Sequence, residues 1–278
     1  MVRERIADEV YVFTSKRYAQ VTVGAILTSE GVILIDTFFY PEETRAVKQF
    51  LEQRLGLPIR YVINTHYHAD HTLGNCLFPQ AQLVSHRRCR ELLHERGGAG
   101  LDQMKAQSPE FGNVTVVLPE MVFDQGDMTF HLGDKTVTLC YLPGHSADLI
   151  GVWVADDRIF FASDNMMPVP TIFDGDLADL QRSLSTILDM NPDFVVQGHG
   201  EVILRGEIES LIQSDLAYLD CIQERVADFL ASGRPEERLA TISIESCGKS
   251  RIPLNGLVAD LHQANLRKLY QELLAVSD

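Results

Sequence analysis

The chain has 278 residues, of which 45% are hydrophobic and 23% charged, so it can build one large domain or two small ones and is not disordered as a whole. Its formal net charge of −15 disfavours binding to nucleic acid or to an anionic membrane. The five cysteines are scattered without a Cys-x-x-Cys pair, which is typical of free thiols in a reducing compartment. Because the N-terminal residues lack the apolar stretch of a signal peptide and no run is long enough to span a membrane, we expect a cytoplasmic protein.

Apolar segments rich in Val, Ile and Phe alternate with helical patterns along the first two thirds of the chain. Period-2 patterns and turn residues predict strands at Val10–Phe13, Val21–Leu27, Val32–Ile35, Tyr61–Asn64, Met128–Leu132, Thr136–Leu142, Ile150–Val154, Ile159–Ala162 and Phe194–Val196. Apolar residues at helical spacing predict helices at Pro41–Leu55, Arg87–Arg96 and Leu177–Met190. We expect Gly97 and Gly98 to end the second helix and the segment up to Gln107 to form a mobile lid or a long loop.

The predicted elements contain a weak internal repeat. A strand ends at Asp36, a helix follows, and a second strand leads to His66. The same order recurs from Asp164 through a helix to His199. Side chains at the carboxyl ends of strands in α/β sheets face a common crevice, so the repeat predicts one cleft shared by the two halves.

The chain from Glu207 onward is acidic and predicted to be mostly helical, with two apolar stripes separated by a Ser-Gly-Arg-Pro break. We therefore expect a first domain at residues 1–206 and a helical C-terminal extension at residues 207–278 that packs on it. Shaping the pocket or forming the face of a homodimer are alternative roles for this extension.

The strongest chemical signal is the segment His66-Tyr67-His68-Ala69-Asp70-His71, directly after a predicted strand. In an extended chain His66 and His68 point the same way, whereas Asp70 and His71 fall where the chain turns into a helix and can face another side. One segment could therefore supply two adjacent metal sites. Imidazole and carboxylate ligands together suit Zn, Fe or Mn.

Three further polar residues follow apolar strands and lie beside glycine or small residues. They are His145 in Pro-Gly-His-Ser, Asp164 in Phe-Ala-Ser-Asp and His199 in Gln-Gly-His-Gly. A single histidine is more often structural than a ligand. Glycine beside it, however, lets the backbone pass close to a metal.

In this order the motifs, from about Val10 to Gly200, resemble the metallo-β-lactamase-fold superfamily. The resemblance implies an αββα sandwich of two similar halves, with Asp36 supporting the metal loops. It further implies a first metal on His66, His68 and His145 and a second metal on Asp70, His71 and His199. Asp164 and a water or hydroxide would bridge the two ions, which we expect to be two Zn²⁺ per chain, with Fe or Mn as alternatives.

The implied ligands suggest a hydrolase that acts on a small molecule. A pair of divalent ions lowers the pKa of a bridging water, and the resulting hydroxide attacks a carbonyl or phosphoryl centre. Asp70 is both a ligand and the candidate catalytic proton acceptor. We expect cleavage of an ester, thioester, lactone or lactam bond. Two apolar loops, Phe38–Tyr40 and Met166–Phe173, are predicted to border the site and to favour a neutral or partly hydrophobic substrate.

Departures from the family pattern indicate which branch of the superfamily the chain resembles, but they do not identify the substrate. Class-one lactamases of this fold usually carry Arg and Cys where this chain has His71 and Asp164, which favours the glyoxalase II-like pattern. The spacing from His145 to Asp148, in contrast, is lactamase-like. Three alternatives stay open: a mononuclear iron persulfide dioxygenase, a phosphodiesterase and a non-catalytic scaffold.

Overall fold

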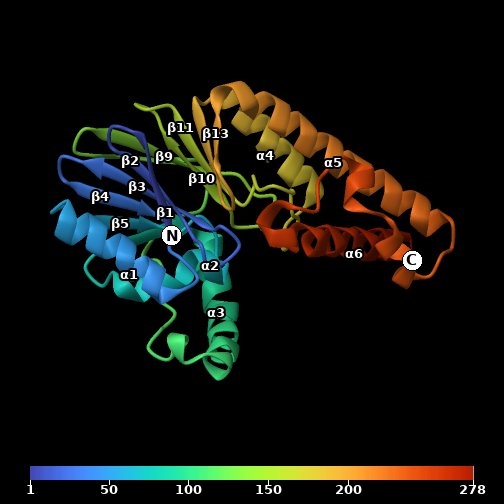
Figure 1. Ribbon diagram of the computed structural model, residues 1–278, viewed down its shortest axis with the longest axis horizontal. Helices are drawn as coiled ribbons and strands as arrows, with labels where there is room; N and C mark the ends of the chain where they lie inside the picture. Colours follow the sequence, from blue (N-terminus) through green and yellow to red (C-terminus); the bar gives the residue numbers. More distant parts are fainter. Residues whose placement is uncertain (278) are drawn as a thin grey trace.

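The computed structural model describes residues 1–277 and contains two β-sheets that pack face to face (Figure 1). The first sheet has seven strands in chain order: β1 (Val2–Ala7), β2 (Val10–Thr14), β3 (Thr22–Thr28), β4 (Gly31–Ile35), β5 (Ile59–Ile63), β6 (Gln82–His86) and β7 (Met121–Phe123). Strands β4 to β7 are parallel and the earlier pairs are antiparallel. All five residues of β4 are buried, as expected for a strand covered on both faces.

The second sheet has six strands in the order β13 (Val202–Leu204), β12 (Phe194–Gln197), β11 (Ile159–Ser163), β10 (Ile150–Val154), β9 (Lys135–Tyr141) and β8 (Met128–Leu132). Only β11 and β12 are parallel. The inner faces of both sheets form one buried cluster, to which Ile33 and Ile63 contribute from the first sheet and Val152 and Phe161 from the second. The predicted sandwich core is therefore confirmed.

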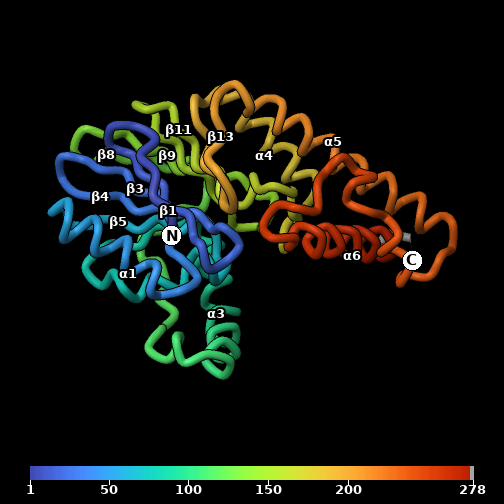
Figure 2. Tube along the Cα trace, viewed as in Figure 1, coloured from blue at the N-terminus to red at the C-terminus, as the bar shows by residue number. Residues whose placement is uncertain are grey.

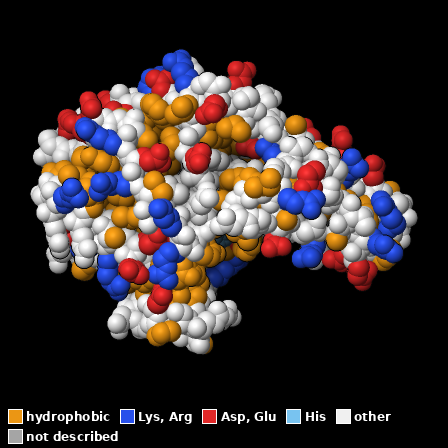
Figure 3. Space-filling model, in the orientation of Figure 1, with side chains coloured by type: hydrophobic (Ala, Val, Ile, Leu, Met, Phe, Trp, Pro, Cys, Tyr) orange, Lys and Arg blue, Asp and Glu red, His pale blue; other side chains and the backbone are white. Residues whose placement is uncertain are grey.

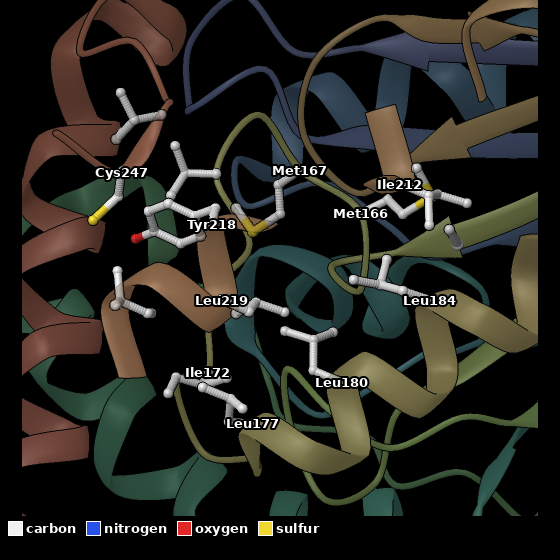
Figure 4. Packing of buried hydrophobic residues seen from close by; sticks show 14 of the residues in the cluster. Met166, Met167, Ile172, Leu177, Leu180, Leu184, Ile212, Tyr218, Leu219 and Cys247 are labelled. Atoms are coloured by element: carbon white, nitrogen blue, oxygen red, sulfur yellow. The ribbon is translucent and has the colours of Figure 1, made fainter. Parts of the chain in front are cut away.

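Helices cover both outer faces of the sandwich. α1 (Pro41–Gln49), continued by a π-helical turn at Phe50–Arg54, packs on the first sheet through Val47 and Leu51. α4 (Leu177–Met190) packs on the second sheet through a stripe that includes Leu180 and Leu184 (Figure 4). The order helix, sheet, sheet, helix gives the expected αββα fold.

Each half of the sandwich contains one parallel strand–helix–strand unit, β4–α1–β5 and β11–α4–β12. The carboxyl ends of these four strands meet at one edge. The short helix α2 (Ala69–Thr72) starts there, after β5. The backbone links the two halves at the same edge, because Thr22 N–H donates to Gly198 O and Ile150 N–H donates to Thr65 O, both at 2.9 Å. The internal repeat thus directs both halves toward one cleft.

The prediction that Gly97 and Gly98 end a helix is wrong, and so are the lid and the long loop expected for the following residues. α3 (Arg87–Gln107) continues through all of them. A glycine inside a helix costs about 1 kcal/mol relative to alanine. Tertiary packing outweighs this cost, because Leu93 on one side of the glycines and Leu101 on the other are both buried.

The chain beyond the sandwich is helical, as expected. It contains α5 (Arg205–Ala231), short 3₁₀ turns and α6 (Leu257–Ser277). Figure 2 shows this orange and red part of the chain gathered on one side of the sandwich. One buried cluster joins α4 to residues such as Tyr218 of α5 and Leu266 of α6, so the extension continues the core.

Charged side chains of both signs are scattered over the face shown in Figure 3 and form no single basic patch there. Within residues 1–277, no helix combines the length and the apolar character needed to cross a bilayer. All five cysteine thiols are free.

Candidate metal centre

The histidine motif lies at the carboxyl end of β5 and runs into α2. His66 and His68 occupy the extended stretch before the helix, where His68 has a β conformation. Nε2 of His66 and Nδ1 of His68 are 2.9 Å apart. Asp70 and His71 belong to the first turn of α2 and therefore face a different direction.

The structure brings the seven sequence-predicted residues together in two adjacent groups. The first group consists of His66, His68, His145 and Asp164; the second consists of Asp70, His71 and His199. Within each group the potential ligand atoms all lie within 4.8 Å of one another. These atoms come from both halves of the sandwich, so neither half could build a group of this kind alone.

Asp164 lies between the two groups. Its Oδ2 is 3.4 Å from Nε2 of His145 and 3.7 Å from Nε2 of His66 in the first group. The same carboxylate is 3.2 Å from Nε2 of His71 and 3.3 Å from Nε2 of His199 in the second group. One side chain therefore contacts histidines of both groups.

Hydrogen bonds to the second ring nitrogen set the tautomer of three of the histidines. Nδ1 of His145 is 2.8 Å from Thr171 O, and Nδ1 of His199 is 2.8 Å from Ala19 O. Nδ1 of His71 is 2.9 Å from the Asp36 carboxylate. Carbonyl and carboxylate oxygens only accept, so each Nδ1 carries a proton and Nε2 is the atom left for a metal.

Nε2 of His68 is buried and makes no hydrogen bond, and neither do two neighbouring buried atoms, Nε2 of His71 and Oδ1 of Asp164. These last two atoms are nevertheless only 3.2 Å apart. Buried polar atoms without a partner are costly, so this pair calls for a positive charge between the two atoms, either a proton on the imidazole or a metal ion. The donor set and these unpaired atoms together fit a metal ion.

Burial dominates the electrostatics of the first group. It lowers the pKa of His145 to about 4 and holds the pKa of His66 well below the usual value for histidine. Burial disfavours the charged form of His71 and His199 too. There the carboxylate of Asp164, helped by Asp70, outweighs it and raises both pKa values.

Unusual backbone conformations hold the two aspartates at the strand ends. Asp36 has φ of 61° and Ser163, just before Asp164, has φ of 48°. Gly198 must lack a side chain, because a Cβ there would lie 1.8 Å from Oδ1 of Asp164. Oδ1 and Oδ2 of Asp36 accept bonds from Thr65 N–H and Thr65 Oγ1, at 2.8 and 2.7 Å.

A cavity of about 240 Å³ opens onto the cluster. Its apolar lining includes Met167 and Phe173 from one of the two loops predicted to border the site. The other loop does not line it: Phe38 is buried in the core, and Phe39 and Tyr40 pack against Phe111 instead. The cavity is also lined by Tyr18 and Ala19, which the sequence did not indicate, and by Leu257 and Leu261 of the extension, for which shaping the pocket was one of the expected alternatives.

The C-terminal helix α6 also supports a first-group histidine through a buried asparagine. Asn265 Oδ1 accepts from Ile172 N–H at 3.0 Å, and its Nδ2 donates to Pro170 O at 2.7 Å. Between these two residues lies Thr171, whose carbonyl accepts the proton of His145 Nδ1. The sequence held one weak signal for this role, a polar residue on the apolar stripe of a helix.

Figure 4 shows part of the buried cluster near this contact, in which Met167 lies beside Tyr218 of α5 and Ile172 lies beside Leu177. Tyr218 Oη lies 3.1 Å from Asn265 Nδ2 and 2.9 Å from Nδ1 of His262. His262, which has no ligand context in the sequence, thus takes part in this buried network.

Comparison with known proteins finds relatives of low identity. A beta-lactamase-like protein 2 homolog of Caenorhabditis elegans is 22% identical over 67% of this chain and 56% of its own length. A hydroxyacylglutathione hydrolase of Rhodopseudomonas palustris is 24% identical over 65% of this chain and 64% of its own. An atrochrysone carboxyl ACP thioesterase of Pseudocercospora fijiensis is 26% identical over 76% and 56%. The chain therefore matches between about half and two thirds of the length of these curated relatives.

Solved structures share the fold. A metallo-beta-lactamase from Pontibacter korlensis superimposes with a TM-score of 0.61 at 22% identity, over 76% of this chain and 98% of that one. A sec-alkylsulfatase from Pseudomonas sp. covers 98% of this chain and 50% of its own, with a TM-score of 0.77 at 16% identity. The family profile described as the Metallo-beta-lactamase superfamily matches residues 18–199, which include all seven clustered residues. The chain belongs to the metallo-β-lactamase superfamily.

Proposed function

We propose that this chain is a dinuclear metal-dependent hydrolase that cleaves an acyl bond in a small molecule, with a thioester as the first candidate. One observation carries the proposal: seven potential ligand atoms converge in two adjacent groups that Asp164 joins. Zinc is the first choice because imidazole and carboxylate ligands suit it, and Fe or Mn are the alternatives. The free thiols and the acidic surface are consistent with a cytoplasmic location.

We assign each residue of the cluster to one or both of the two proposed metal ions. His66, His68 and His145 would hold the first ion, Asp70, His71 and His199 the second, and Asp164 both. Bound ions would polarise the substrate carbonyl and supply a water acidic enough to lose its proton near neutral pH.

Asp70 is the proposed catalytic proton acceptor. Its side chain is 16% exposed and lines the cavity, whereas the Asp164 side chain is only 4% exposed. Oδ2 of Asp70 is 3.5 Å from Nε2 of His199, so the carboxylate is held in place by the second group. A partly exposed carboxylate at this position can take a proton inside the cavity and pass it to solvent.

The thioester is favoured by two independent features. The cavity beside the cluster has the apolar residues Met167, Phe173, Leu257 and Leu261 in its wall, which suits an acyl group. Among the relatives, one is named for hydroxyacylglutathione and another is a thioesterase. Esters, lactones and lactams pass through the same kind of tetrahedral oxyanion, so they form the rest of the substrate panel.

Metal content measured by mass spectrometry on protein purified without added metal is the first test. We expect about two zinc ions per chain.

Thioester hydrolysis by the same preparation then tests the reaction, with His68→Ala as the inactive variant and His94→Ala, an exposed histidine on α3, as its matched control. About one iron per chain, with oxygen consumption on a persulfide, would overturn the proposal in favour of the dioxygenase. Hydrolysis of phosphodiesters alone would favour the phosphodiesterase.

A further inference from the structure

A second cavity, of about 140 Å³, lies beside the candidate metal centre, between α2, α3 and the segment at Val116 and Val117. It shares His68 and Ala69 with the cavity that opens onto the cluster. The rest of its wall is mainly apolar and includes Leu73, Leu93, Leu101 and Met104.

Apart from His68, whose Nε2 makes no hydrogen bond, the polar side chains around this cavity are paired with protein groups. The Tyr67 hydroxyl hydrogen-bonds the Asp174 carboxylate, and Thr72 Oγ1 donates to His68 O at 3.0 Å. Arg96 lies 3.0 Å from the Tyr67 hydroxyl and 3.2 Å from Asp174, so a carboxylate matches its charge. The cavity therefore offers hydrocarbon walls and no free cation that would attract an anionic group.

Two glycines inside α3 leave this space open. Gly97 and Gly100 line the cavity, whereas the neighbouring Gly98 does not. A Cβ at Gly97 would lie 3.2 Å from Val116, but a Cβ at Gly100 would meet no atom within 4 Å. Close packing therefore does not require glycine at position 100. Since Gly100 lines the cavity and a Cβ there meets only open space, we expect a larger side chain at this position to occupy part of the cavity.

We propose that this cavity is a subsite for the uncharged, aliphatic acyl arm of the substrate. An apolar cavity of about 150 Å³ accommodates benzene, so the space suits a chain of about six carbons. Since the cavity shares His68 with the metal centre, an acyl chain lying in it keeps its carbonyl near the cluster. The assignment to an acyl arm rests on the proposed hydrolase function, but the binding of a six-carbon chain does not.

The kinetic test compares Gly100→Leu with Gly98→Leu, which adds the same side chain two residues away, outside the cavity wall. The measurement is kcat/KM for acetyl, butanoyl, hexanoyl and octanoyl thioesters of one thiol. For the unmodified chain and Gly98→Leu we expect kcat/KM to rise about tenfold or more from acetyl to hexanoyl, because each buried methylene favours binding. In Gly100→Leu this ratio falls to about one. A flat chain-length profile in the unmodified chain, or equal profiles for both variants, overturns the subsite.

Met104→Ala gives a second test that does not depend on how Gly100→Leu folds. It enlarges the cavity, so the preferred acyl chain becomes longer by one or two carbons. An unchanged preference contradicts the assignment.

A binding measurement separates this proposal from the proposed function. Hexanamide is titrated into the protein while NMR follows the methyl signals of Leu93, Leu101 and Met104. We expect these signals to shift in the unmodified chain and in Gly98→Leu, but not in Gly100→Leu. Shifts without hydrolysis of any thioester, ester, lactone or lactam of the panel support the subsite and overturn the hydrolase. If thioesters are hydrolysed but the methyl signals do not shift and kcat/KM does not depend on acyl-chain length, the hydrolase is supported and the subsite is overturned.

Discussion

The two ligand groups contain the same kinds of side chain in opposite electrostatic environments. In the first group burial lowers the pKa of His66 and His145, so both imidazoles are neutral at physiological pH. In the second group the carboxylates of Asp164 and Asp70 raise the pKa of His71 against the effect of burial. These two imidazoles are therefore in the neutral form that a metal needs. The second group has to release a proton before it can bind a metal ion.

The supports of the two groups also come from different parts of the chain. Asp36, at the end of β4, holds Nδ1 of His71 in the second group. Thr171, fixed by Asn265 of α6, holds Nδ1 of His145 in the first group. The C-terminal helices thus contribute to the first group. The N-terminal half of the sandwich supports the second group and also reaches His66 of the first, whose Nδ1 lies 3.1 Å from Thr65 Oγ1.

Asp164→Ala gives the largest expected effect, because Asp164 contacts histidines of both groups. We expect metal content to fall in both groups and kcat/KM to drop by about 10³ or more, since the ions supply the main stabilisation of the reaction. Metal analysis and thioester hydrolysis measure this. Asp102→Ala, an exposed carboxylate on α3, is the control. Full metal content in Asp164→Ala would show that the groups are independent.

Asp36→Asn is expected to weaken the second group selectively. An amide nitrogen facing Nδ1 of His71 would donate to it, move the ring proton to Nε2 and thereby block the metal-binding atom. Changes of this kind in the partner of a ligand lower metal affinity by about 10- to 100-fold. Stepwise zinc titration monitored by calorimetry should show weakening of one binding event only. Equal weakening of both events would contradict the pairing of Asp36 with the second group.

Asn265→Leu is expected to have the opposite selectivity. It removes the hydrogen bonds to Pro170 and Ile172, frees the Thr171 carbonyl and weakens the first group by about tenfold. Two backbone groups are left unpaired, so we also expect a loss of about 1–3 kcal/mol for each in the free energy of unfolding.

Leu266→Ala, on the same helix, separates the effect of Asn265→Leu on metal affinity from its effect on the free energy of unfolding. Leu266 is fully buried and the change is comparably destabilising, but the residue does not hydrogen-bond to the loop around Thr171. If Leu266→Ala lowers zinc affinity as much as Asn265→Leu does, the asparagine stabilises the protein only and does not position His145.

The pH dependence of metal binding should distinguish the groups in the unmodified chain. The pKa values of His71 and His199 are raised, so both rings hold protons at pH values above the ordinary histidine range, and zinc must displace these protons. As pH falls through the raised pKa values, affinity for the second ion should fall first. Calorimetry in two buffers of different ionisation enthalpy measures proton release. Equal release on binding of each ion would refute the difference.

Cys76→Ala is expected to have the smallest effect. The Cys76 thiol contacts Leu73 O at 3.7 Å and is not part of either group. Hydrolysis and metal content should therefore stay close to those of the unmodified chain. A complete loss of activity in a folded, metal-loaded variant would indicate a thiol nucleophile.

The local pattern of apolar and polar residues was enough to predict most strands and helices of the sandwich. The helix predicted at Leu177–Met190 matches α4 residue for residue, because its apolar stripe and the capping Asp176 are both local features. The strands β1, β6, β7 and β13 were not predicted, because the exposed edge strand Val2–Ala7 and the short strands lack a clear alternation of apolar and polar residues. α3 was predicted too short, because glycines lower helix propensity and long-range packing is invisible in the sequence.

In the candidate site, too, some residues could be predicted from local sequence and others could not. His66, His68, Asp70 and His71 stand out because four ligand types follow one strand within six positions. Asn265, in contrast, lies 120 positions from His145 and acts through a backbone carbonyl, so no spacing rule could connect the two.

The sequence by itself determined which residue types were available for metal chemistry and which strand ends would carry them, because periodicity and motif spacing are properties of neighbouring residues. The tertiary structure alone decided the rest. Folding two distant halves onto each other placed Asp164 between two histidine groups and gave those groups opposite pKa shifts. Burial and through-space charge depend on the distances between residues, which the order of residues along the chain does not specify.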